Sequence, residues 1–538
     1  MKNLWKALLM VRRCSPRSFW LRVVYVLLQS VLPLVNLYIL KQLVDAVTTS
    51  RSMDSALWML LAMCGVFLLN RVVSALSAIN NDYLSQRLID YMSDVMQRQS
   101  AALDMAYYDT PSYHDTFHRA QQESTFRPMQ ILTSFMTLGG AVVSMCGVMV
   151  MLCSASPWII AVMVVAVSPS FAVRLYKARS IYAFRRNHTQ LYRRTSYYGA
   201  LLTGRDFAKE VRTYALAPLF RGRFLEARHT LVKRLLAISR RLGMLDVVCS
   251  VFEAGAMLGV VWMLLDRTFA GAVTIGSFVM LFEAFRRGQG YLTSLVGAVS
   301  SLYDNRLFVG NLFEFLELKP TVLNPANPQP MPERVEVVEF RDVTFRYPDM
   351  TSDVLSGFSL TARRGEVTRL DGRNGYGKST LVKLLLRLYD PAQGAVMVDG
   401  VDIRRFDLKE LRSRVGVLYQ DFVRYYCTVS DNVAFGKSGG GADLERALRL
   451  AGADEVVERL PQGVDTLLGR LFDGGSELSM GQWQRIALAR AIASDAPVLV
   501  FDEPTAWLDS AARARFAEAL RELSRDRVVI LITHSQDF

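Results

Sequence analysis

The sequence predicts a chain of two unlike parts. Residues 1–317 form an all-α domain of six membrane-spanning helices with long cytosolic extensions, and residues 335–538 form an α/β domain. Three observations support this prediction: apolar runs before residue 300, five prolines within residues 318–332, and a glycine-rich loop between a strand and a helix further on. Because proline lacks a backbone donor and breaks helices, residues 318–334 are predicted to be a linker between the two parts.

The first part contains runs long enough to cross a bilayer, which takes about 20 apolar residues. The six candidate spans lie near residues 19–40, 57–79, 131–153, 158–173, 244–265 and 275–299. Several charged residues fall within or beside these runs: Arg71, Glu253, Glu283, Arg286 and Arg287. Charges facing lipid are costly, so we expect these residues to face a protein or water-filled interior. They are candidate residues of a substrate cavity, or else they pair with one another or lie at interfaces.

The distribution of basic residues predicts how the first part is oriented. The chain has a net charge of +13, and the segment 172–242 holds seventeen Lys or Arg against three acidic residues. Because this segment lies between apolar runs, membrane topology explains the excess better than nucleic-acid binding, and no nucleic-acid partner is expected. The basic N-terminus and the polar segments 80–128 and 174–242 are expected in the cytosol. The short connections near 46–54, 154–157 and 266–274 are then expected outside.

The first functional motif of the α/β part is the stretch LDGRNGYGKSTL, residues 370–381. It fits the pattern G-x-x-x-x-G-K-[ST] between a predicted strand and a predicted helix. Glycines let backbone N–H groups turn toward a phosphate, and the helix beginning near Lys378 adds the positive end of its dipole. Lys378 can reach the outer phosphates of a nucleotide, and Ser379 can offer its hydroxyl to magnesium. The loop therefore predicts a nucleotide-phosphate site.

A pair of carboxylates, Asp502 and Glu503, follows the apolar run 498–501. Such a run is typical of a buried parallel strand, and ligands bind at the carboxyl ends of these strands. One carboxylate can hold magnesium through water, while the next can polarise an attacking water. Alone, the pair could equally be two solvated acids at a strand end. The phosphate loop favours the catalytic interpretation.

A second anion site is predicted in the stretch GGSELSMGQWQRIALARAIAS. Ser479 can cap a helix from about Met480 to Ala493, and a serine and glycine at a helix start can bind a phosphate. The chain already has one phosphate loop. A second phosphate site is explained if it acts on the nucleotide held by another subunit.

Taken in order, these motifs resemble the ATP-binding cassette of ABC transporters, a P-loop NTPase fold. The chain as a whole resembles a half-size exporter of that superfamily, and the resemblance implies ATP and Mg²⁺ as cofactors. The residues that it implies for ATP are Tyr347 against adenine, Gly372, Asn374, Gly375, Gly377, Lys378, Ser379 and Thr380 in the phosphate loop, Gln420, the signature residues Ser479, Gly481 and Gln482, and Asp509. It implies Ser379, Gln420 and Asp502 for Mg²⁺, and Glu503 with His534 for catalysis.

Two further features bear on the resemblance. Residues 105–120 and 208–216 resemble the two cytosolic coupling regions of exporters, although solvated loop helices would also explain them. Met480 stands where the signature most often has glycine. Since Ser479 and Gly481 are retained beside it, we predict a working site.

The function that the resemblance implies is ATP-driven export of an amphipathic substrate, such as a peptide, a lipid or a drug-like molecule, by alternating access. The protein is expected to work as a dimer with a second half-transporter, identical or different, in the cytoplasmic membrane of a bacterium. The N-terminus and the cassette would lie in the cytosol. An ATP-gated channel or membrane sensor that does not pump is the alternative. The residues Glu503, Ser479 and His534 favour a hydrolysing cycle and hence transport.

Overall fold

The computed structural model describes residues 2–110, 117, 120, 124, 126–153, 157–348, 350–371, 377–437, 441 and 443–534. The chain divides into two compact units. Unit 1 comprises Met1–Ala101 and Thr116–Glu317, and unit 2 comprises Ala102–Asp115 and Leu318–Phe538. A short piece from early in the chain, Ala102–Asp115, thus belongs to the same unit as the C-terminal half.

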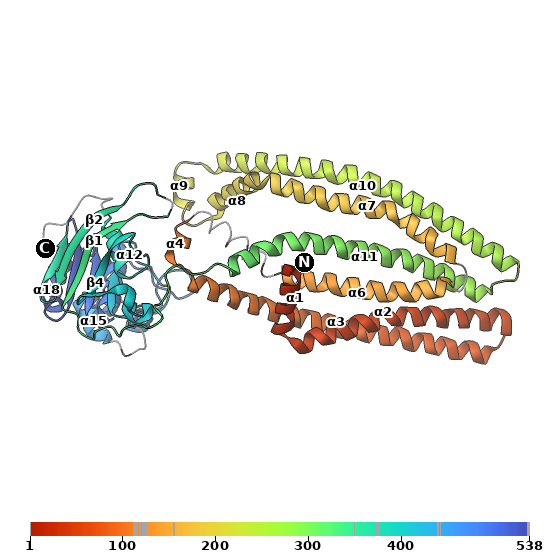
Figure 1. The fold of residues 1–538 in the computed structure, drawn as a ribbon, viewed down its shortest axis with the longest axis horizontal. Helices are drawn as coiled ribbons and strands as arrows, with labels where there is room; N and C mark the ends of the chain where they lie inside the picture. The colour runs from red at the N-terminus through yellow and green to blue at the C-terminus, as the bar shows by residue number, and fades with distance from the viewer. Residues whose placement is uncertain are drawn as a thin grey trace. The chain divides into compact units, whose positions relative to one another are not determined.

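Unit 1 is built from helices (Figure 1). They are α1 (Lys2–Cys14), α2 (Pro16–Asp45), the π-helical turn η1 (Ala46–Ser50), α3 (Met53–Ala102), α6 (Arg127–Cys153), α7 (Pro157–Asn187), α8 (Thr189–Thr203), α9 (Ala208–Thr213), α10 (Ala217–Phe269) and α11 (Ile275–Leu316). Helix α11 packs on α6, α2 and α7, and α10 packs on α7 and α8. Gly147 lets α2 and α6 approach closely, because a Cβ there would lie 2.2 Å from Leu34 Cδ1.

Five helices are long and apolar enough to cross a membrane. These candidate spans are Pro16–Thr49, Met53–Ala102, Arg127–Cys153, Pro157–Ile181 and Ala217–Phe269, among the residues that the structure describes. The sixth predicted run, 275–299, lies in α11, a continuous helix of 42 residues that is not among these five. Its charges at Glu283, Arg286 and Arg287 lower its apolar character, and Glu283 pairs with both arginines.

Unit 2 contains two four-stranded sheets. The antiparallel sheet has the order β2 (Leu355–Arg363), β1 (Val337–Phe345), β4 (Gln393–Val398), β5 (Val401–Asp402). The parallel sheet has the order β3 (Val367–Leu370), β8 (Val528–Ile532), β7 (Val498–Asp502), β6 (Val415–Leu418). The helices of this unit are α4 (Met105–Tyr108), α12 (Lys378–Leu385), the 3₁₀ turn η2 (Ile403–Arg405), α13 (Leu408–Ser413), α14 (Val429–Ala434), α15 (Leu444–Leu450), α16 (Asp454–Glu458), the 3₁₀ turn η3 (Gly463–Asp465), α17 (Met480–Ile492) and α18 (Ser510–Ser524).

The parallel sheet is covered on both faces, as the unbroken apolar sequences of β7 and β8 require. Alternate residues of a strand point to opposite faces. Leu499 and Phe501 accordingly pack in one core with α17 and α18, while Val498 and Val500 pack in another with α12 and the antiparallel sheet. Strand β3 is at the edge of its sheet, which explains why it tolerates Arg369, whose guanidinium pairs with Asp371 at 2.7 Å.

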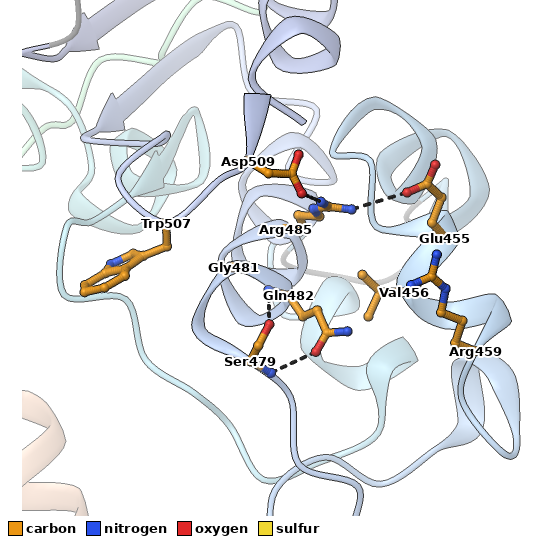
Figure 2. Close-up of a pocket in the computed structure, with 9 residues that line it drawn as sticks. All are labelled: Glu455, Val456, Arg459, Ser479, Gly481, Gln482, Arg485, Trp507 and Asp509. Atoms are coloured by element: carbon orange, nitrogen blue, oxygen red, sulfur yellow. Dashed lines mark hydrogen bonds and ion pairs between the residues drawn. The ribbon is translucent and has the colours of Figure 1, made fainter. Parts of the chain in front are cut away.

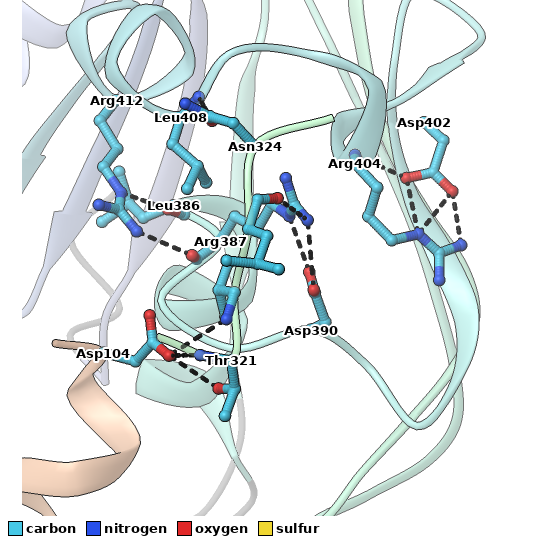
Figure 3. A network of polar contacts seen from close by, with 12 residues as sticks. Asp104, Thr321, Asn324, Leu386, Arg387, Asp390, Asp402, Arg404, Leu408 and Arg412 are labelled. Carbon is cyan, nitrogen blue, oxygen red and sulfur yellow. Dashed lines mark hydrogen bonds and ion pairs between the residues drawn. The ribbon is translucent and has the colours of Figure 1, made fainter. Parts of the chain in front are cut away.

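The proline-rich stretch belongs to unit 2 and is held to other segments of that unit by polar contacts (Figure 3). Asp104 accepts hydrogen bonds from the backbone and hydroxyl of Thr321 and from Val322 N. Further along, Asn324 bonds to Asp407 and to Leu408 N, each at 2.8 Å. Prolines cannot supply such bonds from their own nitrogen, so the residues between them hold the stretch in place.

Candidate functional site

The phosphate helix α12 begins where the glycine-rich loop ends. Gly377 has φ +78° and is its N-cap, and a Cβ there would lie 2.8 Å from Leu355 Cδ2. Glycine is therefore required at this position both by backbone conformation and by space. The predicted loop residues Gly372, Asn374 and Gly375 lie outside the described residues.

Two residues predicted to hold the metal lie side by side. Ser379 Oγ donates to Asp502 Oδ2 at 2.8 Å, and Asp502 is 3% exposed at the end of β7. Burial raises the pKa of Asp502, against the lowering effect of the Ser379 hydrogen bond, and the charges of Glu503 and Asp421 raise it further. A bound cation would relieve this unfavourable burial of charge.

The donor set fits Mg²⁺. A hydroxyl and a carboxylate are the hard oxygen ligands that Mg²⁺ uses together with substrate phosphates. Among the residues that the structure describes, no cluster of three His, Cys, Asp or Glu side chains could hold a metal by itself. The third predicted ligand, Gln420, is exposed in the turn after β6, next to the Asp421 whose charge acts on Asp502.

Of the two predicted catalytic residues, His534 contacts both the other one, Glu503, and the phosphate-loop lysine. The ring nitrogen Nε2 of His534 lies 2.8 Å from Lys378 Nζ and 3.3 Å from Glu503 Oε1. Glu503 has φ +50°, a left-handed backbone conformation that is unusual for a residue with a side chain. Its backbone N–H donates to Ile532 O at 2.9 Å, which holds the backbone of Glu503 to the neighbouring strand β8.

Tyr347 contacts α12 through Thr380, a residue of that helix. The hydroxyl of Tyr347 is 3.1 Å from Thr380 Oγ1, and its ring meets the rings of Phe345 and Tyr389 edge-on. Tyr347 thus stands beside the phosphate helix, where a base attached to a bound phosphate chain could reach it. The ring of Tyr347 is thus positioned by Phe345 of strand β1, by Thr380 of helix α12 and by Tyr389 of the loop after α12.

The predicted signature residues lie at the start of α17 and line a cavity of about 500 Å³ (Figure 2). Ser479 and Gln482 form a reciprocal cap: Ser479 Oγ accepts from Gln482 N at 3.3 Å, and Gln482 Oε1 accepts from Ser479 N at 2.8 Å. A Cβ at Gly481 would lie 2.5 Å from Trp507 O, so this position requires glycine. Met480, by contrast, is 38% exposed, and its Sδ accepts a hydrogen bond from Arg424 Nη1 at 3.9 Å.

Asp509 lines the same cavity, together with acidic and basic side chains. Its carboxylate caps α18 by accepting from Ala512 N at 2.8 Å, and Arg485 Nη2 donates to it at 3.0 Å. The backbone hydrogen bond and the arginine charge lower the pKa of Asp509. The lining thus carries two arginines, Arg459 and Arg485, and two acids, Glu455 and Asp509, and Arg485 pairs with both acids.

The described site residues therefore form two groups. The first gathers Tyr347, Lys378, Ser379, Thr380, Asp502, Glu503 and His534 around α12, and the second gathers Ser479, Gly481, Gln482 and Asp509 around the cavity. Gln484, which the sequence reasoning missed, joins the two groups. Its amide donates to Glu503 O at 3.1 Å and accepts from Trp507 N at 3.0 Å. A glutamine on the buried face of an apolar helix is the signal that could have identified it, because a buried amide needs partners.

Comparisons with known proteins show which proteins the chain is similar to. A family model described as ABC transporter matches residues 355–506. The subtilin transport ATP-binding protein SpaT of Bacillus subtilis is 26% identical over 96% of this chain and 85% of its own length. The nisin transport ATP-binding protein NisT of Lactococcus lactis subsp. lactis is 24% identical over 94% and 84%. An ATP-dependent lipid A-core flippase of Chromohalobacter salexigens is 34% identical over 60% of this chain and 55% of its own length.

The fold of the whole chain also has a solved counterpart. The structure of a bacterial Atm1-family ABC exporter with ATP bound superposes with a TM-score of 0.77 at 22% identity, covering 98% of this chain and 91% of that one. The C-terminal part of the chain therefore carries an ABC transporter domain, and the chain is similar over nearly its whole length to ABC exporters, in which an ATP hydrolase coupled to transport is joined to a multi-pass membrane domain.

Proposed function

We propose that this protein exports an amphipathic substrate across the cytoplasmic membrane as a dimer of half-transporters, with two ATP molecules held between the cassettes. The observation that carries the proposal is the convergence of Lys378, Glu503 and His534, with Ser379 and Asp502 beside them. Bound Mg²⁺-ATP would supply the phosphoryl group whose hydrolysis drives the cycle.

The side chains of this group suit the individual requirements of hydrolysis. Glu503 is placed to polarise an attacking water, and His534 can hold the carboxylate and the outer phosphates in register. Lys378 provides the positive charge that developing phosphate charge requires. Ser379 and Asp502 would hold the metal.

The second group of residues supports the dimer. Ser479, Gly481 and Asp509 line a cavity in the same cassette as the phosphate loop, but the described residues of that loop do not line this cavity. A cassette that used both groups on one nucleotide would need them to meet, whereas among the described residues Gln484 links them through the backbone of Glu503 and Trp507. Engagement of a partner's nucleotide by the cavity gives both groups a role in one reaction.

The nature of the cargo rests on the membrane unit and on the relatives. Relatives are named for subtilin, nisin and lipid A-core. In α11, Glu283 forms a bidentate pair with Arg286, and Arg287 donates to Pro33 O at 3.4 Å within otherwise apolar surroundings. A cavity that mixes such charges with apolar side chains suits cargo with polar and apolar parts.

Replacement of Glu503 by Gln tests the chemistry. We expect Glu503→Gln to lower ATP turnover by roughly 10²- to 10⁴-fold, the usual contribution of a general base, while Mg²⁺-ATP still binds. The matched control is Glu518→Gln, the same change at an exposed position of α18, which should hydrolyse ATP at the parent rate. Parent-level turnover in Glu503→Gln would remove Glu503 from the mechanism.

Transport itself requires a separate measurement. Inside-out vesicles that contain the parent protein should accumulate labelled peptide or lipid cargo against its gradient when ATP is added, and Glu503→Gln vesicles should not. Equilibration down the gradient without accumulation would instead indicate an ATP-gated channel.

A further inference from the structure

A carboxylate from the N-terminal half of the chain reaches the flank of the phosphate helix. Asp109, just after α4, belongs to unit 2. Its Oδ2 accepts a hydrogen bond from the hydroxyl of Tyr389 at 2.5 Å and from Lys383 Nζ at 3.3 Å. Lys383 is in the last turn of α12, the helix that carries Lys378 and Ser379 at its start.

Lys383 connects this carboxylate to Tyr347. The ammonium Nζ lies 5.0 Å from the centroid of the Tyr347 ring and 5.8 Å from that of Tyr389. A cation at this distance over an aromatic face is attracted by the electron density of the ring. One face of Tyr347 is therefore taken by Lys383, and a nucleotide base can stack only on the other.

The remaining contacts fix the tilt of the same ring. Tyr389 meets Tyr347 edge-on, with centroids 5.4 Å apart at 87°, and Phe345 does so at 4.9 Å and 82°. The Tyr347 hydroxyl lies 3.1 Å from Thr380 Oγ1. Asp109 in turn holds two of the residues that restrain Tyr347, namely Lys383 and Tyr389.

The surroundings make this arrangement depend on the charge of Asp109. The side chains of Asp109 and Lys383 are 34% and 27% exposed, so water screens their attraction only in part. Burial and the contact with Asp109 raise the pKa of Tyr389, which keeps its hydroxyl protonated and able to donate. Without the carboxylate, Lys383 would lose the counter-charge that the described residues give it, and its flexible stem could leave the ring.

We propose that Asp109 is a positioning residue for the nucleotide base: by holding Lys383 and Tyr389, it sets the face and tilt of Tyr347 on which adenine stacks. This inference rests on the proposed function in one respect, the contact between Tyr347 and adenine. It gives the segment that follows α4 a chemical role at the base, separate from any contact with the phosphates. A displacement of this segment would change the affinity for the base and leave the hydrolytic groups in place.

The test compares nucleotides that differ in their base, using full-length protein in nanodiscs. Steady-state ATPase and CTPase kinetics separate KM from kcat for a purine and a smaller pyrimidine. We expect Asp109→Asn to raise KM for ATP roughly 3- to 30-fold with kcat nearly unchanged, and to lower the preference for ATP over CTP. The expected rise in KM is smaller than the roughly 5- to 150-fold rise expected for Tyr347→Leu, because that variant removes base stacking altogether. Asp109→Glu, which keeps the charge, should restore part of the loss.

The matched control is Asp104→Asn in the same segment. Asp104 also binds through its carboxylate, but to Thr321 and Val322 rather than to the Tyr347 group (Figure 3). Its variant should keep the parent KM for ATP and the parent base preference. If Asp109→Asn does not fold, Lys383→Met provides the same test and should show the same base-dependent rise in KM.

The outcomes are distinguishable. Unchanged KM and base preference in Asp109→Asn, with a clear effect in Tyr347→Leu, overturns the role of Asp109 and leaves the adenine contact standing. A fall in kcat with no change in base preference also overturns it, because that is the signature of a merely structural role. If Tyr347→Leu also has parent base preference, the adenine contact itself is wrong.

Discussion

Two adjacent carboxylates at the end of β7 occupy opposite environments. Asp502 is buried under α12 and hydrogen-bonded to Ser379, whereas Glu503 lies past the strand end and faces His534. Side chains alternate along a strand, and the left-handed backbone of Glu503 turns the chain sharply at this point. Neighbours in the sequence can therefore take different roles, one as a proposed metal ligand and one as a proposed base.

We expect Asp502→Asn to raise the thermal stability of the nucleotide-free protein and to abolish its stabilisation by Mg²⁺-ATP. Burial raises the pKa of Asp502, so its ionised form costs stability in the folded cassette. Because the folded-state pKa is above the unfolded value, the cost is full at neutral pH and is relieved as the pH falls through the raised pKa. The gain in melting temperature of the variant over the parent should thus shrink in mild acid.

Asp509→Asn serves as the control, since its effect has the opposite sign. The pKa of Asp509 is lowered by the Ala512 N–H and by Arg485, so its ionised form stabilises the fold above the unfolded pKa. Melting curves at neutral pH should show a lower midpoint for this variant. A similar rise in both variants would contradict the assignment for Asp502.

Among the elements, α17 shows how one local motif serves both stability and the cavity. Ser479 and Gln482 satisfy each other's backbone N–H groups, and the same turn lines the cavity with Asp509. An equivalent reciprocal cap, Thr428 with Asp431, starts α14. The two caps offer a direct comparison, since only the first lines the proposed site.

We expect Ser479→Ala and Thr428→Ala to lower the free energy of unfolding by similar amounts, about 0.5–2 kcal/mol, because each removes a helix cap. Only Ser479→Ala should also lower ATP turnover beyond what its lost stability explains. Denaturant unfolding and ATPase assays on both variants measure the two effects. An equal loss of turnover in Thr428→Ala would assign the effect to the cap alone.

Across the whole chain, the longest helices extend beyond any bilayer. Helices α3 and α10 have 50 and 53 residues, about 75–80 Å at 1.5 Å per residue, whereas the hydrocarbon core is about 30 Å thick. In α10 all basic residues except Arg267 precede the apolar run, and the described Lys and Arg side chains between 177 and 241 are all exposed. Their charge predicts that these extensions lie on the cytosolic side.

Chemical labelling of intact cells tests this topology. In a background without the six natural cysteines, Ser52→Cys and Ala270→Cys should react with a membrane-impermeant maleimide. Thr213→Cys, in the basic segment, should react only after the membrane is permeabilised. Labelling of Thr213→Cys in intact cells would invert the proposed orientation.

Motif spacing predicted the cassette and much of its site. The phosphate-loop pattern, the strand-end acids and the capped helix each contain enough local information to be recognised in the sequence. The order in which they occur predicts one α/β fold that gathers them at the carboxyl ends of its strands. Lys383 and Tyr389 carry no such local pattern, so sequence reasoning could not select them.

The sequence by itself determined the elements: apolar runs long enough to span lipid, a helix that must start at a glycine, and buried strands with acids at their ends. These follow from interactions between neighbours along the chain and from the polarity of each residue. Tertiary structure alone decided which distant residues meet, such as Asp109 with Lys383 and Tyr389, or Gln484 with Glu503 and Trp507. Such pairings depend on how separate elements pack, and packing depends on all contacting side chains together rather than on any single stretch of sequence.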